Sequence, residues 1–225
     1  MPSPDLAPLL AVDPARRRDL VVDAVTKRYV SGPVVLDGVT HTFRPGTATA
    51  LVGPNGSGKS TLLRVLSAMS PPTHGRVCYG DLDVHRQPHR ALASVAVVHD
   101  APDLPGHLTA AETAEWVARE RGAWDAGAPA RHAALFDAVR LDSRRDAPTG
   151  TYSSGMTRKA QLAVAFAGAP AVVLADEPFR ALDTEATEAA LALLAAFRDG
   201  GGTVVLSSHR ADLLERLCDD TLALG

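Results

Sequence analysis

A glycine-rich segment with one lysine constrains the fold of this chain more than any other feature. It reads Gly53-Pro54-Asn55-Gly56-Ser57-Gly58-Lys59-Ser60-Thr61 and directly follows the apolar run Ala48 to Val52. Helical spacing of apolar residues begins at its end, from Ser60 to Ser70. A glycine, four residues and then Gly-Lys-Ser/Thr between a strand and a helix is the pattern of a phosphate-binding loop, or P-loop. Glycines allow backbone N–H groups to surround a polyphosphate at the positive helix N-terminus.

The side chains at the end of this loop suit particular parts of a bound nucleotide. Lys59 can reach the β- and γ-phosphates, and the Ser60 hydroxyl can ligate Mg²⁺. An ordinary glycine-rich turn is the alternative, but it does not require a strand before it and a helix after it. GTPases, kinases, helicases and transport ATPases share this loop, so other motifs must indicate the reaction.

Short apolar runs alternate with segments of helical spacing along most of the chain. Strands are predicted at 20–25, 48–52, 95–98, 171–175 and 203–207, and helices at 60–70, 110–121, 128–139, 156–167, 185–197 and 210–218. Several strands are apolar throughout, as expected for strands buried on both faces of a parallel sheet. The pattern predicts an α/β fold. Residues 103–154 lack a convincing strand and are expected to form an inserted helical lobe. Residues 1–18 hold four prolines and a basic run, so we expect a flexible arm.

Composition narrows the classes of function. The 225 residues include 23 Lys and Arg against 26 Asp and Glu, giving a formal charge of −3. No broad basic field is expected, and nucleic acid is not an expected partner. Two cysteines, Cys78 and Cys218, are too few for a disulfide framework and indicate a reducing compartment. The most apolar stretch, 162–175, is interrupted by Gly168 and Pro170 and is shorter than the ~20 residues that span a bilayer.

Two later strands end in residues suited to phosphate chemistry. The run 171–175 leads into Asp176 and Glu177, and the run 203–206 leads into Ser207, Ser208 and His209. Asp176 is expected to hold Mg²⁺, while Glu177 can orient and polarise an attacking water. His209 can hydrogen-bond the γ-phosphate. A charged strand end with a turn at Pro178 is the plainer alternative for the acidic pair.

Together these motifs resemble the ATP-binding subunit of ABC transporters. Tyr152-Ser153-Ser154-Gly155-Met156 looks like a variant of the family's signature loop, usually Leu-Ser-Gly-Gly-Gln, in a form typical of exporters. Ala181-Leu182-Asp183 resembles the family's D-loop, and Tyr29 resembles the aromatic residue that stacks on adenine. The resemblance covers residues 20–225.

The resemblance implies a specific fold and set of site residues. The fold would be an α/β P-loop NTPase (RecA-like) core with a mainly parallel sheet, an antiparallel β-lobe at the N-terminal side and an inserted helical subdomain. A single domain would span 19–225, with the core at 19–100 and 156–225 and the helical subdomain at about 101–155. The implied catalytic residues are Lys59, Glu177 and His209. The nucleotide-binding set would be Tyr29, Gly53, Pro54, Asn55, Gly56, Ser57, Gly58, Lys59, Ser60 and Thr61.

The resemblance also implies an assembly. ATP would lie between the P-loop of one subunit and the signature loop of another in a head-to-tail dimer, with Ser153, Ser154 and Gly155 acting in trans and Asp183 in the D-loop. The second subunit would be another copy of this chain or a homologous ATPase. Both would lie on the cytoplasmic face of the membrane, bound to transmembrane permease subunits. ATP and Mg²⁺ are the implied cofactors.

Two residues depart from the family's pattern. Asp100 stands where the glutamine of the Q-loop usually lies, and could still touch Mg²⁺ together with Ser60 and Asp176. Arg180 occupies a position where a small polar residue is usual.

The leading hypothesis is an ATPase subunit that drives transport, with the signature form and the end of the chain after the last core strand leaning towards export. A soluble ABC ATPase acting on ribosomes or DNA is one alternative. A nucleotide-binding regulatory protein with weak hydrolysis is the other, which Asp100 and Arg180 favour mildly and Glu177 and His209 oppose. The transported substrate cannot be predicted from this sequence.

Overall fold

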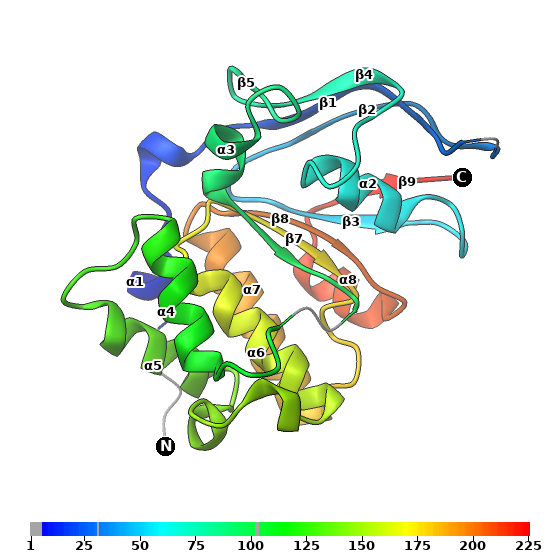
Figure 1. Cartoon of the computed structure of the whole chain (residues 1–225). Helices are drawn as coiled ribbons and strands as arrows, with labels where there is room; N and C mark the ends of the chain where they lie inside the picture. The colour runs from blue at the N-terminus through cyan, green and yellow to red at the C-terminus, as the bar shows by residue number, and fades with distance from the viewer. Residues whose placement is uncertain (1–5, 31, 102–103) are drawn as a thin grey trace.

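Two β-sheets of different type organise the computed structural model, which describes residues 6–30, 32–101 and 104–225. One sheet is antiparallel, with strand order β2-β1-β4-β5, and the other is parallel, with order β6-β7-β8-β3-β9. Figure 1 shows the antiparallel sheet above the parallel one, with α2 (Lys59–Leu66) between them. This arrangement confirms the predicted α/β fold with an antiparallel lobe at the N-terminal side.

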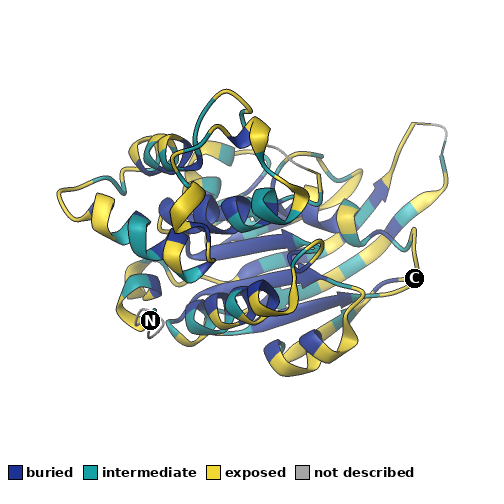
Figure 2. Cartoon of the chain, turned by 90° about the horizontal axis from the view of Figure 1, so that it is seen from below, coloured by how far each residue is buried: buried dark blue, intermediate teal, exposed yellow. Residues whose placement is uncertain are grey.

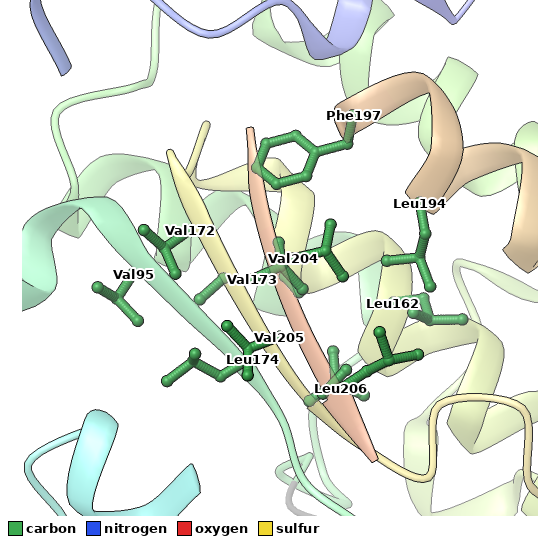
Figure 3. Packing of buried hydrophobic residues seen from close by; sticks show 14 of the residues in the cluster. Val95, Leu162, Val172, Val173, Leu174, Leu194, Phe197, Val204, Val205 and Leu206 are labelled. Atoms are coloured by element: carbon green, nitrogen blue, oxygen red, sulfur yellow. The ribbon is translucent and has the colours of Figure 1, made fainter. Parts of the chain in front are cut away.

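The parallel sheet is the core of the molecule. It contains β3 (Ala48–Val52), β6 (Val95–Val98), β7 (Val172–Asp176), β8 (Thr203–Ser207) and β9 (Asp220–Ala223). The side chains of Val172–Ala175 and Thr203–Ser207 are buried, and Phe197 and Leu194 of α7 (Thr184–Asp199) and Leu162 of α6 (Ser154–Ala167) pack against these strands (Figure 3). Apolar residues at consecutive positions form these strands because helices cover both faces of the sheet. In Figure 2 its central strands are almost entirely in the buried colour.

The antiparallel sheet was predicted as a lobe, but most of its strands were not recognised in the sequence. It consists of β1 (Leu20–Arg28), β2 (Val34–Phe43), β4 (His74–Tyr79) and β5 (Leu82–Asp83). β2 pairs with β1 across register shifts, and Gly38 lies within it at φ +61°. Its mixed pattern of buried and exposed residues gives no clean alternation, which explains why the strand was missed.

Helices complete the core and form a separate group. The longer ones are α4 (Ala110–Glu120), α5 (Ala128–Ala138), α6 (Ser154–Ala167) and α7 (Thr184–Asp199), and the shorter ones are α1 (Ala7–Leu10), α3 (Pro88–Ala91) and α8 (Ala211–Leu217). The described residues from 104 to 153 contain no strand, and α4 and α5 pack against each other and α6. We retain a helical subdomain at about 101–155 as a proposal. Within the described ranges, no helix has the length and apolar character to cross a membrane.

The N-terminal segment differs from the flexible arm expected over residues 1–18. Residues 1–5 lie outside the described residues, but 6–18 pack on the core: Leu10 and Val12 are buried, and α1 contacts α7. The Arg16 guanidinium donates to the carbonyls of Ala169 (2.7 Å) and Ala93 (3.2 Å). The prolines and arginines predict a flexible arm, but burial of Leu10 and Val12 and the hydrogen bonds of Arg16 hold residues 6–18 on the core.

Candidate nucleotide-binding site

The main candidate site is a cavity of about 720 Å³ at the carboxyl ends of the parallel strands. Open α/β sheets characteristically bind ligands at this edge. The lining combines the P-loop, the strand ends and the loop that follows β7. Its residues include Asn55, Gly56, Gly58, Lys59, Ser60, Thr61, Asp100, Asp176, Glu177, Arg180, Ser207, Ser208 and His209.

The P-loop joins β3 to α2, as predicted. Gly58 caps α2 in the left-handed region, at φ +99°, where a Cβ would come within 2.7 Å of Leu36 Cδ2 and 2.9 Å of the Val35 carbonyl. Glycine is therefore required here by conformation and by space. The Lys59 ammonium donates to the carbonyls of Gly53 (2.7 Å) and Pro54 (3.0 Å), which holds it over the loop.

The acidic pair and the histidine line the same cavity as the P-loop. The Ser207 hydroxyl donates to Asp176 Oδ1 at 2.5 Å, which orients that carboxylate. Glu177 Oε1 lies 3.4 Å from His209 Nε2, and the His209 backbone N–H donates to Glu177 Oε2 at 3.4 Å. Glu177 itself has φ +50°, an unusual conformation for a non-glycine residue. The end of β7 thus contributes two carboxylates to the cavity that the phosphate-binding loop also lines.

Oxygen donors suited to Mg²⁺ occur together at this site. Ser60 and Asp176 both line the cavity, and Asp176 is already oriented by Ser207. A hydroxyl, a carboxylate and substrate phosphates form the hard oxygen set that Mg²⁺ prefers. These residues therefore fit the predicted cation.

Several predicted nucleotide-binding residues lie beside the cavity rather than in its lining. Gly53, Pro54 and Ser57 belong to the loop but do not line the cavity. Tyr29 is 40% exposed, with Lys27 Nζ 5.0 Å from its ring centre. Its hydrogen bond with the Thr61 side chain lowers the pKa of Tyr29 and ties it to the start of α2. The roles of these residues remain predictions.

The signature residues are outside the lining of this cavity. Ser153 caps α6 by accepting from the backbone N–H of Met156 at 3.3 Å. A Cβ on Gly155 would come within 2.8 Å of the Ala181 carbonyl, so the loop after β7 lies directly against the start of α6. Asp183 caps α7 by accepting from Ala186 N–H at 2.7 Å. Both motifs are therefore helix N-termini packed beside one another.

The residue with a predicted metal role that fits least well is Asp100. Both of its carboxylate oxygens accept from the Arg180 guanidinium, at 2.8 and 2.6 Å. The buried Arg158 donates to the Asp100 carbonyl at 2.8 Å and lies 3.5 Å from Oδ1. Asp100 lines the cavity but is engaged by arginine, in contrast to the predicted metal contact.

Sequence reasoning missed two contributors to the site. Ser207 was seen as part of the Ser-Ser-His strand end, but its bond to Asp176 depends on the parallel pairing of β7 with β8. Arg158 follows the signature loop in the sequence, and its contact with the carbonyl of His99 after β6 arises from tertiary packing. The ion pair between Asp100 and Arg180 was also not predicted, although their opposite charges were a signal for it.

The fold and the site define a P-loop nucleotide hydrolase. Residues 36–180 match the family model described as ABC transporter, so the chain belongs to the ABC transporter family as an ATP-binding subunit with ATPase activity.

Named relatives agree on the class and differ in cargo. The chain is 33% identical over 201 residues to the Nod factor export ATP-binding protein I of Ralstonia nicotianae, covering 89% of this chain but only 62% of that protein. It is 34% identical over 205 residues to the cobalt import ATP-binding protein CbiO of Rhodobacter capsulatus, covering 89% of this chain and 73% of that protein.

A solved structure provides the comparison in three dimensions. A dimeric ATP-binding cassette in a post-hydrolysis state with ADP and Pi superposes with a TM-score of 0.79. Sequence identity is 27%, and the match covers 91% of this chain and 94% of that one. The predicted P-loop ATPase fold is thereby confirmed.

Proposed function

We propose that this chain hydrolyses ATP as one half of a dimer and so drives transport, with a lean towards export, through separate membrane subunits. Its location would be the cytoplasmic face of the membrane. The signature form supports the export direction, while the relatives include both an export and an import protein.

The roles of individual residues follow from their positions around the cavity. The P-loop and Lys59 would bind the phosphates. Ser60 and Asp176 would hold Mg²⁺, which neutralises phosphate charge when bound. Glu177 would orient the attacking water, and His209 would hydrogen-bond the γ-phosphate and keep the Glu177 carboxylate in place.

One observation carries this proposal. The P-loop and Glu177 share a cavity, whereas Ser153, Ser154 and Gly155 do not line it. A signature loop outside its own subunit's nucleotide cavity suits contact with ATP bound by another subunit. The dimeric cassette with ADP and Pi supports the same assembly.

A nucleotide-binding regulatory subunit with weak hydrolysis is the second candidate, because Asp100 and Arg180 both depart from the family's usual pattern. A soluble ABC ATPase acting without a membrane partner has no specific observation in its favour.

Glu177→Gln tests the proposal directly. This variant should bind ATP, lose nearly all hydrolysis and form a dimer with Mg-ATP, because the water is no longer activated. Light scattering with and without Mg-ATP measures the dimer, and phosphate release measures the turnover. Glu120→Gln, at an exposed position on α4, is the matched control and should behave like the unmodified protein. Unchanged turnover in Glu177→Gln would exclude Glu177 as the catalytic carboxylate.

Co-purification tests the membrane partner. Tagged Glu177→Gln protein expressed in its native host should retain permease subunits in detergent extracts of membranes. Recovery solely from the soluble fraction, with no membrane protein bound, would favour a non-transport ATPase.

A further inference from the structure

The two residues that depart from the family pattern contact each other. Asp100 follows β6, and Arg180 lies in the loop after β7, 80 positions later in the chain. The guanidinium donates to both oxygens of the carboxylate, at 2.8 and 2.6 Å. Both bonds come from one guanidinium nitrogen, Nη1, and hydrogen bonds between two ionised groups are stronger than those between neutral groups. The ion pair therefore accounts together for the two residues that differ from the family's pattern, because each is the charged partner of the other.

One end of this pair is anchored in the core. Arg158 of α6 has only 5% of its side chain exposed, and it donates to the carbonyls of His99 (2.5 Å) and Asp100 (2.8 Å). These bonds hold the backbone after β6 against the helix that begins with the signature loop. Asp100 is therefore the fixed member, and the 64% exposed Arg180 is the member that it restrains.

The other end lies in the loop that carries Glu177. The Arg180 backbone N–H donates to the Glu177 carbonyl at 3.1 Å. Glu177 and Ala181 on either side of this turn have φ +50° and +62°. Such conformations persist in non-glycine residues only where surrounding contacts maintain them. The ion pair with Asp100 is such a contact, acting from the neighbouring strand.

We propose that Arg180 is a positioning residue for ATP hydrolysis, whose ion pair with Asp100 holds the loop after β7 so that Glu177 faces the phosphate-binding loop. This inference rests on the catalytic role proposed for Glu177. It replaces the predicted metal role of Asp100, because that carboxylate acts on the loop and not on Mg²⁺. It also gives Arg180 an activating role, in contrast to the weak hydrolysis expected of a regulatory subunit.

A double-mutant cycle separates this pair from its alternatives. The variants are Arg180→Gln, Asp100→Asn and the double variant, assayed for kcat, KM for ATP and the Mg²⁺ concentration that gives half-maximal rate. Each single variant should lower kcat roughly three- to tenfold with KM unchanged, since small displacements of a catalytic group slow chemistry more than binding. The double variant should be no slower than the singles, because the same contact is lost.

Charge-exchanged and conservative variants test the chemistry of the contact. Arg180→Lys should retain part of the rate, and Asp100→Arg combined with Arg180→Asp should recover rate relative to either exchange alone. A purely structural role would show in the unfolding temperature but would not give this split between kcat and KM. Arg216→Gln serves as the control, because it breaks an arginine–carboxylate pair elsewhere in the fold: Arg216 of α8 donates to both carboxylate oxygens of Glu188 on α7, each at 2.7 Å.

Three results would overturn the inference. These are multiplicative losses in the double variant, full activity in both singles, or a higher Mg²⁺ requirement in Asp100→Asn alone, which would restore the metal role. Failure of the proposed function is distinguishable, since it would appear as undiminished turnover in Glu177→Gln whatever the cycle shows.

Discussion

Lys59 makes the most direct contribution of a single charge to the site. Its ammonium is held by the Gly53 and Pro54 carbonyls at 2.7 and 3.0 Å, within the loop that would surround the phosphates. Removing it deletes a charge-assisted hydrogen bond worth about 1.5–3 kcal/mol. We expect Lys59→Ala to weaken ATP binding by about 10- to 150-fold.

Titration with a fluorescent ATP analogue measures this loss. Lys159→Ala is the control, because Lys159 lies on α6 and its ammonium contacts the Arg140 carbonyl at 3.5 Å, away from the cavity lining. Equal affinities in Lys59→Ala and the unmodified protein would contradict the assignment of the P-loop.

The sequence predicted the site residues that belong to motifs of consecutive residues. The sequence placed Lys59 at the end of the P-loop and Asp176 and His209 at strand ends, and the structure brings all three to one cavity. Their functional roles remain proposals. The contacts of Asp100 with Arg180 and of Ser207 with Asp176 join different strands, and strand order is not visible in a single sequence.

At the scale of elements, the N-terminal segment, residues 6–18, holds several helices and strands together through hydrogen bonds. Besides its carbonyl contacts, Arg16 lies 3.2 Å from Ser94 Oγ, and its own carbonyl accepts from the Tyr79 hydroxyl. Arg17 donates to the carbonyls of Val12 and Gly200, both at 3.0 Å. The segment thereby connects β4, the start of β6 and the ends of α6 and α7.

We expect Arg16→Ala to destabilise the protein by about 1–2 kcal/mol, because several carbonyl and hydroxyl partners lose their donor. For a chain of this size the unfolding temperature should fall by roughly 2–8 °C. Differential scanning calorimetry is the measurement. Arg18→Ala is the control, since Arg18 is exposed and stacks beside Gly80 through its aliphatic part. Equal effects of the two substitutions would show that the segment is not held by Arg16.

Helices with a clear repeat of apolar residues were predicted to within a few residues. Strands at a sheet edge, or with a mixed pattern of buried and exposed residues, were not predicted. The expected helix at 185–197 is observed as α7 (Thr184–Asp199), since Asp183 and the apolar spacing mark its start. β9 was missed because it is short and mostly exposed at the edge of the parallel sheet. Burial supplies the apolar signal, so strands with little burial give little signal.

At the scale of the whole molecule, stability should depend on pH in two separate ranges. Burial lowers the pKa of His85 and His132, so their charged forms are disfavoured in the folded state. Two surface carboxylates have a lowered pKa. The hydrogen bond from the Thr109 backbone N–H lowers the pKa of Glu112, and the hydrogen bonds from Arg216 lower the pKa of Glu188. Both kinds of group bind protons more readily in the unfolded chain, so both stabilise the fold at higher pH.

We therefore expect the unfolding temperature to be nearly constant from about pH 7 to 8 and to fall in two steps on acidification. The first step begins near pH 6.5, where unfolded histidines gain protons that folded His85 and His132 resist. The second begins near pH 4.5, where the unfolded carboxylates gain protons and the folded ion pairs are lost. Calorimetry across pH 3.5–8 on the unmodified protein and on His85→Gln combined with His132→Asn measures both. The double variant should keep the second step and lose most of the first, and a first step of undiminished size would show that other groups cause it.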